Sequence, residues 1–488
     1  MSIAAAKKHR FFAGTLLLFI LFLSLRLYQL GSRDLWYDEV ISFYYAQQPM
    51  VSGNAPLYYG ILHYWLKIAP FSEFVLRFPS AISSFMSVIL VFLLGKELFG
   101  KKTALFASLL MGLSPFQIWY AQEARTYSMM LFFGALSLYL FHRALRYRRA
   151  TLWWGFMAAS LLGIYTNYFF FVLFFVQVTY TLIFFKKVRL KLREIIPFLC
   201  VGALFLPYLG PFLQKFFTIR NGFWIPRPSL YSLWVTIENI ILGYNAHREV
   251  YALTSLLVTI LFVATMLTLQ DKELRPRIIF CLYFFLAPVL FSFLFSRLFF
   301  SVYIDRALII VTPALYLLIG LGIAAMWEKA IIVMCTILCY GLLAYYTGEM
   351  PMPVGHHIGT YVKRPIRPIV AFIRDNRGGD DICGFTNYGL QLPFVFYETD
   401  KTMETYYFFD PRILDTTWKQ PFGEGRLCVP MHKIETLPFK RLWLVASNWN
   451  RDGGLCENSR SVKEWLDNHF TLQLCKKLHG SWVFAYER

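Results

Sequence analysis

The sequence predicts a polytopic α-helical membrane protein, with about eleven transmembrane helices and a C-terminal extracytoplasmic α/β domain. The chain has 488 residues, of which 57% are hydrophobic, 19% aromatic and only 16% charged. This composition is typical of membrane proteins rather than of soluble ones. Apolar stretches recur at lengths that approach or reach a bilayer span. Short loops rich in Lys and Arg alternate with longer, aromatic loops between these stretches.

The apolar stretches define the predicted spans. They are 11–30, 75–94, 103–120, 127–142, 151–166, 168–185, 195–213, 250–269, 278–296, 307–326 and 330–347. The basic connections include "KKHR", "GKELFGKK", "HRALRYRRA" and "KKVRLKLR", and by the positive-inside rule they lie in the cytoplasm. The first span lacks a following small-residue cleavage site, so we interpret it as a retained signal anchor. The predicted localisation is a bacterial cytoplasmic membrane, with the N-terminus inside and the tail outside.

The basic excess of the chain belongs to its membrane part. The net charge is +19, and residues 1–350 contain 30 Lys and Arg against 14 Asp and Glu. The tail is nearly balanced, with 18 basic and 15 acidic residues. The charge therefore reflects membrane topology, and we expect no nucleic-acid partner.

Two domains are predicted, a membrane domain over 1–350 with a first outer loop at about 31–74, and an α/β domain over 351–488. In the tail, "PIRPIVAFIRDNR" and "SVKEWLDNHF" predict helices, the second capped by Ser459 or Ser461. "DICGFTN" and "RLWLVASNW" predict strands, and "TLQLCKKLHGSWVFAYE" predicts a hairpin. Four cysteines permit two disulfides or four free thiols. They are Cys383, Cys428, Cys456 and Cys475.

The adjacent carboxylates Asp38 and Glu39 follow the first span in "RDLWYDEVIS", on the predicted outer face. A carboxylate there can meet both an aqueous substrate and lipid head groups. Charged residues at the membrane boundary are costly to bury and are functional candidates. Two later outer loops carry such residues, namely Glu123, Arg125 and Tyr127 in the first, and Arg297, Tyr303, Asp305 and Arg306 in the second. We expect these loops to form one site.

These segments resemble a known superfamily. "DLWYDEVIS", "NAPLYYGILHYWLKIAPFSEFVLRFPSAIS" and "LSPFQIWYAQEARTYSMM" are similar to segments of GT-C glycosyltransferases, of the bacterial kind related to protein O-mannosyltransferases and lipid A aminoarabinose transferases. The resemblance implies transfer of a sugar from a polyprenyl phosphate to an acceptor on the outer face. It also implies that Asp38 is the base and that Glu39 is a second acid. Where the superfamily commonly has an aspartate soon after the arginine, this chain has Tyr127, so Glu123 is the substitute candidate.

The chemistry requires these residue types. A hydroxyl is a poor nucleophile at neutral pH, and a positioned carboxylate such as Asp38 accelerates its attack by about 10²- to 10⁴-fold. The leaving lipid phosphate gains charge, which suits the planar fork of arginine. Arg125 and Arg306, together with Tyr127, are therefore the candidate donor phosphate ligands. Direct displacement inverts the anomeric centre and needs only one carboxylate, in contrast to a retaining glycosidase.

Other interpretations remain open at this stage. Arg125, Arg306 and Arg77 are alternatively interfacial anchors. A divalent metal is a candidate cofactor, with Asp38, Glu123 and His63 as its candidate ligands. The expected partners are a polyprenyl-phosphate-linked sugar, membrane lipid, and a glycan, lipid or protein acceptor. Alternative functions are a transporter or flippase of lipid-linked sugars, a glycan ligase that uses a lipid diphosphate donor, and a noncatalytic scaffold. No Walker A, dinucleotide-binding or HExxH motif supports another chemistry.

Overall fold

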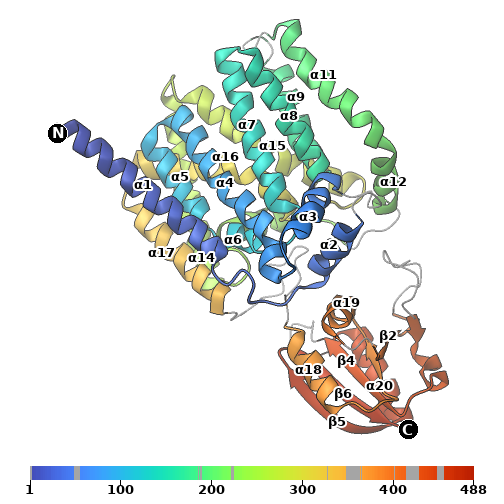
Figure 1. Cartoon of the computed structure of the whole chain (residues 1–488). Helices are drawn as coiled ribbons and strands as arrows, with labels where there is room; N and C mark the ends of the chain where they lie inside the picture. The colour runs from blue at the N-terminus through green and yellow to red at the C-terminus, as the bar shows by residue number, and fades with distance from the viewer. Residues whose placement is uncertain are drawn as a thin grey trace. The chain divides into compact units, whose positions relative to one another are not determined.

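The computed structural model divides into two compact units (Figure 1). It describes residues 3–48, 55–184, 186, 190–220, 225–326, 328–347, 363, 365–399, 402–413, 428–447 and 455–488. The first unit comprises Met1–Leu30 and Tyr45–Tyr361, and the second comprises Gly31–Tyr44 and Val362–Arg488. The short segment Gly31–Tyr44 is therefore grouped with the C-terminal domain, although more than 300 residues separate the two in sequence.

The first unit is helical, and each predicted span coincides with a helix or a pair of helices. These elements are α1 (Ile3–Leu27), α4 (Glu73–Phe99), α5 (Lys101–Leu113) with α6 (Pro115–Ala121), α7 (Tyr127–Tyr147), α8 (Ala150–Thr166), α9 (Phe170–Ile183), α11 (Leu192–Phe205) with α12 (Leu209–Arg220), α14 (Arg248–Leu267), α15 (Arg275–Leu298), η3 (Ala307–Val311) with α16 (Thr312–Met326), and α17 (Ala330–Thr347). Seven helices in the described part are long and apolar enough to cross a membrane, or eight if α5 and α6 form one span. The polytopic helical class is thus confirmed.

Three helices were not among the predicted spans. α2 (Tyr37–Gln47) and α3 (Pro56–Ile68) lie in the predicted first outer loop, and α13 (Leu230–Leu242) precedes α14. Their lengths of 11 to 13 residues are below what a bilayer span needs. Hydrophobic length alone therefore does not identify them as spans.

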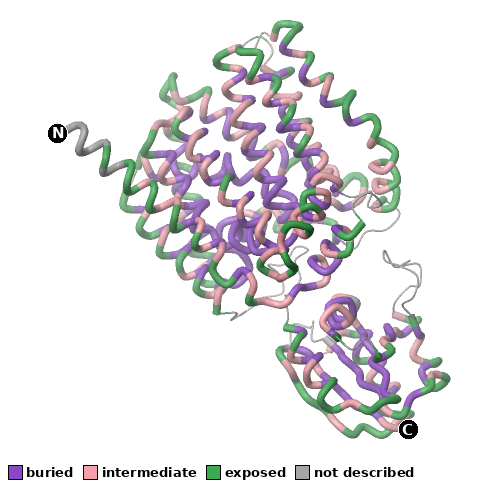
Figure 2. The backbone as a smooth tube through the Cα atoms, in the orientation of Figure 1, coloured by how far each residue is buried: buried purple, intermediate pink, exposed green. Residues whose placement is uncertain are grey.

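Among the candidate spans of the described residues, the one formed by η3 and α16 is the most deeply buried, with 94% of its most apolar part inside the protein. Figure 2 shows buried segments in the interior of the helical unit, whereas α11 and α12 are largely exposed at its edge. α16 approaches α14 closely at Gly322, where an added Cβ would lie 2.1 Å from the Leu261 carbonyl oxygen. Small residues permit such close helix contacts in membranes.

The second unit contains a six-stranded sheet in the order β3-β2-β1-β4-β6-β5. Its strands are β1 (Ile382–Phe385), β2 (Glu404–Phe409), β3 (Cys428–Pro430), β4 (Arg441–Ser447), β5 (Thr471–Leu478) and β6 (Ser481–Glu487). The first four are parallel, and β6 pairs antiparallel with both β4 and β5. α18 (Arg367–Asn376) and α19 (Tyr388–Tyr397) cover one face, and α20 (Glu457–His469) covers the other. This confirms the α/β class of the tail.

One detail of the tail differs from the sequence prediction. α20 begins at Glu457 with Cys456 as its N-cap, so neither Ser459 nor Ser461 caps it. Both hydroxyls instead bond across the domain, Ser459 to Thr386 at 2.6 Å and Ser461 to the Asp410 carboxylate. No disulfide joins the cysteines, all of which are among the described residues. The predicted hairpin is confirmed as β5 and β6. Its two-residue turn has positive φ at His479 and Gly480, as the type I′ turn favoured in such hairpins requires.

Candidate active site

The candidate site begins at a break in a membrane span. α6 leaves α5 at an angle of 58°. Ser114 stabilises the turn. Its hydroxyl oxygen accepts from the Gln117 amide at 3.3 Å, and its O–H group donates to the Ile240 carbonyl oxygen at 3.3 Å. The chain then enters residues 122–126 inside the protein, and of these only Arg125 is more than slightly exposed. The break therefore supplies a buried polar loop within an otherwise apolar unit.

Gln122 fixes this loop to two distant helices. Its Nε2 donates to the carbonyl oxygen of Tyr28 at 2.7 Å and to that of Arg26 at 3.1 Å. Its Oε1 accepts from the Tyr345 hydroxyl on α17 at 2.9 Å. A buried amide with several good partners is a rigid anchor. The loop that carries the predicted acid and arginine is thus held at its first residue.

Arg125 is half-buried and faces polar groups. Its Nη1 donates to the Tyr59 hydroxyl on α3 at 3.3 Å, and its carbonyl oxygen accepts from Ser80 Oγ on α4 at 3.2 Å. A second cationic side chain, Lys215 of α12, is close enough to interact electrostatically with Arg125. The planar fork of the Arg125 guanidinium matches the geometry of phosphate oxygens. Arg125 is therefore suited to hold a phosphate.

Arg306 and Tyr127 come together although 179 positions separate them in sequence. The Arg306 guanidinium carbon lies 5.4 Å from the centre of the Tyr127 ring. Arg306 is 8% exposed and immediately precedes η3, and Tyr127 is the first residue of α7. The interaction is of the cation–π type. Two of the three residues predicted to bind the donor phosphate are thus in contact.

The neighbouring Asp305 is held by α13. Its two carboxylate oxygens accept from Thr236 Oγ1 and from Asn239 Nδ2, each at 2.6 Å. The Tyr303 hydroxyl donates to the same threonine at 3.0 Å. Asp305 is fully buried, so its charge is balanced by hydrogen bonds rather than by solvent. These bonds fix the backbone next to Arg306.

Glu123 lies in the same loop as Arg125 and is 1% exposed. Its carbonyl oxygen accepts the Arg125 amide at 2.8 Å, which makes a tight turn between the two residues. The sequence-predicted acid and the arginine are therefore two positions apart on one constrained loop. The enclosure of Glu123 distinguishes it from an acid that faces solvent.

Asp38 and Glu39 lie in the first turn of α2, in the second unit. Glu39 is fully buried, and its Oε2 accepts from the Trp36 amide at 3.4 Å, as the third residue of a capped helix does. Asp38 remains partly exposed. A carboxylate in the first turn is favoured by the helix dipole. Of the two acids, Asp38 is therefore the more accessible to a substrate.

The metal-ligand prediction finds no supporting cluster. Among the residues that the structure describes, no group of three or more His, Cys, Asp or Glu could hold a metal ion. His63 Nδ1 lies 2.7 Å from the Ala46 carbonyl oxygen, a bond that joins α3 to the end of α2. Arg77 is also internal, and its Nη1 donates to the Leu30 carbonyl at 2.9 Å. With 2% of its surface exposed, Arg77 is not a lipid-facing anchor.

Sequence reasoning missed Tyr59, Lys215, Thr236 and Asn239. Tyr59 stands in "NAPLYYG", where neighbouring aromatic residues hide it. Lys215 lies two residues beyond the predicted span 195–213 and therefore resembles an ordinary loop lysine. In the structure it lies within α12, and a lysine within an apolar helix is a functional signal. Thr236 and Asn239 contact Asp305 only because α13 packs against the loop that carries it. No sequence pattern reveals that packing.

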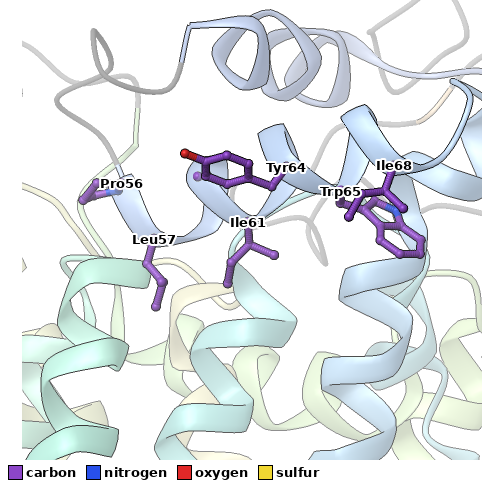
Figure 3. Close-up of a pocket in the computed structure, with 7 residues that line it drawn as sticks. Pro56, Leu57, Ile61, Tyr64, Trp65 and Ile68 are labelled. Atoms are coloured by element: carbon purple, nitrogen blue, oxygen red, sulfur yellow. The ribbon is translucent and has the colours of Figure 1, made fainter.

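A separate apolar groove of about 500 Å³ runs along α3. Its lining residues include Leu57, Ile61, Trp65 and Ile68, which Figure 3 shows along one helix. Trp65 stacks on Phe78 of α4, with ring centroids 5.5 Å apart. The groove and the Arg125 contact thus share α3, because Tyr59 belongs to the same helix.

Comparison with known proteins shows what this chain is similar to. Residues 53–214 match the family described as dolichyl-phosphate-mannose-protein mannosyltransferase. The solved structure of ArnT from Cupriavidus metallidurans bound to undecaprenyl phosphate is similar to this chain, with a TM-score of 0.61 at 14% identity. The match covers 97% of this chain and 98% of the ArnT chain. The chain has the fold of this solved structure over nearly its whole length.

The solved structure of the oligosaccharyltransferase of Archaeoglobus fulgidus, in complex with Zn and sulfate, is also similar in fold to this chain. Its TM-score is 0.51 at 10% identity, with 96% of this chain and 72% of that chain covered. A comparison with curated protein sequences gives no match. The family match includes Glu123, Arg125 and Tyr127 but neither Asp38 nor Arg306. The last two residues are therefore candidates on other grounds.

Proposed function

We propose that this GT-C protein transfers a sugar from a polyprenyl-phosphate donor to a glycan, lipid or protein acceptor on the outer face of a bacterial cytoplasmic membrane. The observation that carries the proposal is the contact between Arg306 and Tyr127. Tyr127 follows Arg125 by two positions, so the contact brings the two arginine-bearing segments together. The fold is shared with the solved structure of ArnT bound to undecaprenyl phosphate. Cationic side chains from both halves of the membrane domain suit a lipid phosphate. Lys215, which interacts electrostatically with Arg125, is a further cationic side chain of the first unit.

In the proposed reaction, an acceptor hydroxyl attacks the anomeric carbon of the donor. Asp38 takes the hydroxyl proton as the new carbon–oxygen bond forms. The bond from the anomeric carbon to the phosphate oxygen breaks, and the lipid phosphate leaves with the bonding electrons toward Arg125 and Arg306. Attack opposite the leaving group inverts the anomeric centre. The arginines stabilise charge that develops as the bond breaks, which is the type of interaction that accelerates a reaction.

The exposure of the three candidate acids supports the choice of Asp38. Asp38 is partly exposed in the first turn of α2. Glu39 and Glu123 are enclosed by protein. The partly exposed Asp38 is therefore the better acceptor base.

Mass analysis of envelope lipids and glycans, from cells with and without the protein, tests this function. Loss of the protein should cause a polyprenyl-phosphate sugar to accumulate and one sugar to disappear from an envelope product. Accumulation of a lipid diphosphate glycan would instead favour a ligase. Trapping of an intact lipid-linked sugar in the inner leaflet, without a missing transfer product, would favour a flippase. A change in neither pool would contradict transfer.

A further inference from the structure

The segment that carries Asp38 is bonded to the C-terminal domain. Asp34 lies just before α2, and its Oδ2 accepts the backbone amides of Ile366 at 2.7 Å and Arg367 at 2.9 Å. Its Oδ1 lies 3.3 Å from Arg367 Nη1. These amides are at the start of α18, where the helix leaves its first N–H groups without internal partners. A carboxylate from a distant segment thus caps a helix of the C-terminal domain.

Two further contacts hold the same segment. The Leu35 amide donates to the Tyr397 hydroxyl of α19 at 2.8 Å. The Arg367 guanidinium lies 4.5 Å from the centre of the Tyr397 ring, so the two anchors support each other. Farther along α2, the Phe43 ring lies 5.3 Å from the Phe396 ring. The C-terminal domain therefore contacts the segment both before and after Asp38.

We propose that the C-terminal domain is a clamp that positions Asp38 for proton transfer. In this proposal Asp34, Arg367 and Tyr397 are positioning residues, and they act through Asp38 without touching the substrate. The proposal rests on the role assigned to Asp38 above. It gives the domain a part in the reaction that neither its fold nor its sequence assigns.

The physical argument concerns the precision that catalysis requires. A general base must lie within hydrogen-bond reach of the proton it removes, and a displacement of about 1 Å can reduce the rate on the order of 10²-fold. Asp34 precedes Asp38 by four residues, and Phe43 follows it by five. A loosened clamp would therefore displace the carboxylate while leaving the arginines of the first unit unchanged.

The test combines clamp variants with Asp38→Asn in the full-length protein. Asp34→Ala removes the acceptor for both α18 amides, and Tyr397→Phe removes only the hydroxyl while keeping the ring beneath Arg367. Each should lower kcat by about 10-fold, because a misplaced base is less effective, and should leave the Kd for undecaprenyl phosphate unchanged. Asp34→Asn keeps an acceptor oxygen and should restore part of the activity. Arg374→Ala, at an exposed position of the same helix α18, is the matched control and should keep full activity.

The decisive result is the effect in the Asp38→Asn background. If the clamp acts through Asp38, loosening it should have little further effect on kcat once Asp38 is replaced. Both variants should then lower kcat by less than about 2-fold, because residues that act as a unit are non-additive. Equal losses in both backgrounds, or no loss in either, would overturn the clamp while the role of Asp38 stands. Near wild-type turnover by Asp38→Asn alone would overturn both. Thermal unfolding identifies a misfolded variant, and Tyr397→Phe, the smaller change, then decides the result.

Discussion

Adjacent residues of one helical turn can have different chemistry, and α2 is an example. Asp38 and Glu39 are both carboxylates of the first turn, but Glu39 is fully buried and bonds the Trp36 amide, whereas Asp38 is partly exposed. The cap explains why an acid is useful at position 39 without a catalytic role. The order of the two acids in the sequence could not distinguish them, because burial depends on what packs around the helix.

Replacement of Asp38 by Asn tests the base directly. The change keeps size and hydrogen bonding but removes basicity, so turnover should fall by at least about 10²-fold with donor affinity little changed. Glu39→Gln should reduce turnover less, since the amide oxygen can still accept from Trp36. Both are measured as kcat and donor Kd on purified protein. Near wild-type transfer by a folded Asp38→Asn protein would remove Asp38 from the mechanism.

Arg125 and Arg306 should behave as ligands of one phosphate. Each Ala substitution should weaken donor binding by about 1.5 to 3 kcal/mol, the range for hydrogen bonds to charged groups. The double variant should show a coupling energy of at least about 0.5 kcal/mol, and Lys should rescue poorly because it lacks the planar fork. Donor titration measures all four proteins. Simple additivity, or full rescue by Lys at both positions, would indicate that the two arginines are separate anchors.

At the scale of elements, the sequence predicted the spans better than the elements between them. Hydrophobic length identifies α4, α14 and α15 because lipid imposes it. It could not reveal the break after Leu113, which depends on hydrogen bonds of Ser114 with Gln117 and Ile240. Nor could it reveal that α13 holds Asp305. Periodicity thus predicts which segments are helices, while the site depends on contacts between segments.

The contact of α16 with α14 should tolerate no side chain at position 322. Gly322→Ala would place its Cβ against the Leu261 backbone, and overpacking of this kind costs about 1 to 3 kcal/mol. The melting temperature in detergent should therefore fall. Gly202→Ala is the matched control, since an added Cβ in α11 has no neighbour within 4 Å. An unchanged melting temperature for Gly322→Ala would contradict the close packing described.

The contact between Asp410, at the end of β2, and Ser461 of α20 should be sensitive to acid. Hydrogen bonds from the Arg412 guanidinium, together with one from Ser461, hold the pKa of the Asp410 carboxyl well below its usual range. A lowered pKa in the folded state stabilises the domain above the unfolded value of about 4, and this contribution is lost as the pH falls through the folded value. Amide hydrogen exchange of β2 and α20 should show protection decreasing below about pH 4. In the Asp410→Asn variant, the amides of β2 and α20 should be less protected from exchange at pH 7, and their protection should depend less on pH. A variant whose protection has the same pH profile as the wild type would contradict this role of Asp410.

For the whole molecule, orientation remains a prediction from loop charge. The alternation of basic and aromatic loops places the N-terminus in the cytoplasm and the tail outside. A reporter that is active only in the cytoplasm, fused after Arg488, should therefore be silent, and the same reporter fused within the basic loop after α7 should be active. Activity at the C-terminus would overturn the outer placement of the tail and of Asp38.

The bonds of Asp34 and Leu35 have a consequence for the order in which the chain is made. Their partners, Ile366 and Tyr397, lie 332 and 362 residues later. The ribosome completes the N-terminal partner long before the C-terminal one, because domains emerge in sequence order during synthesis. Contacts of such high sequence separation also form slowly. The contacts of residues 31–44 can therefore form only after the last part of the chain has been made. If the clamp operates, the protein cannot acquire activity gradually during translation and becomes competent only when its final domain has folded.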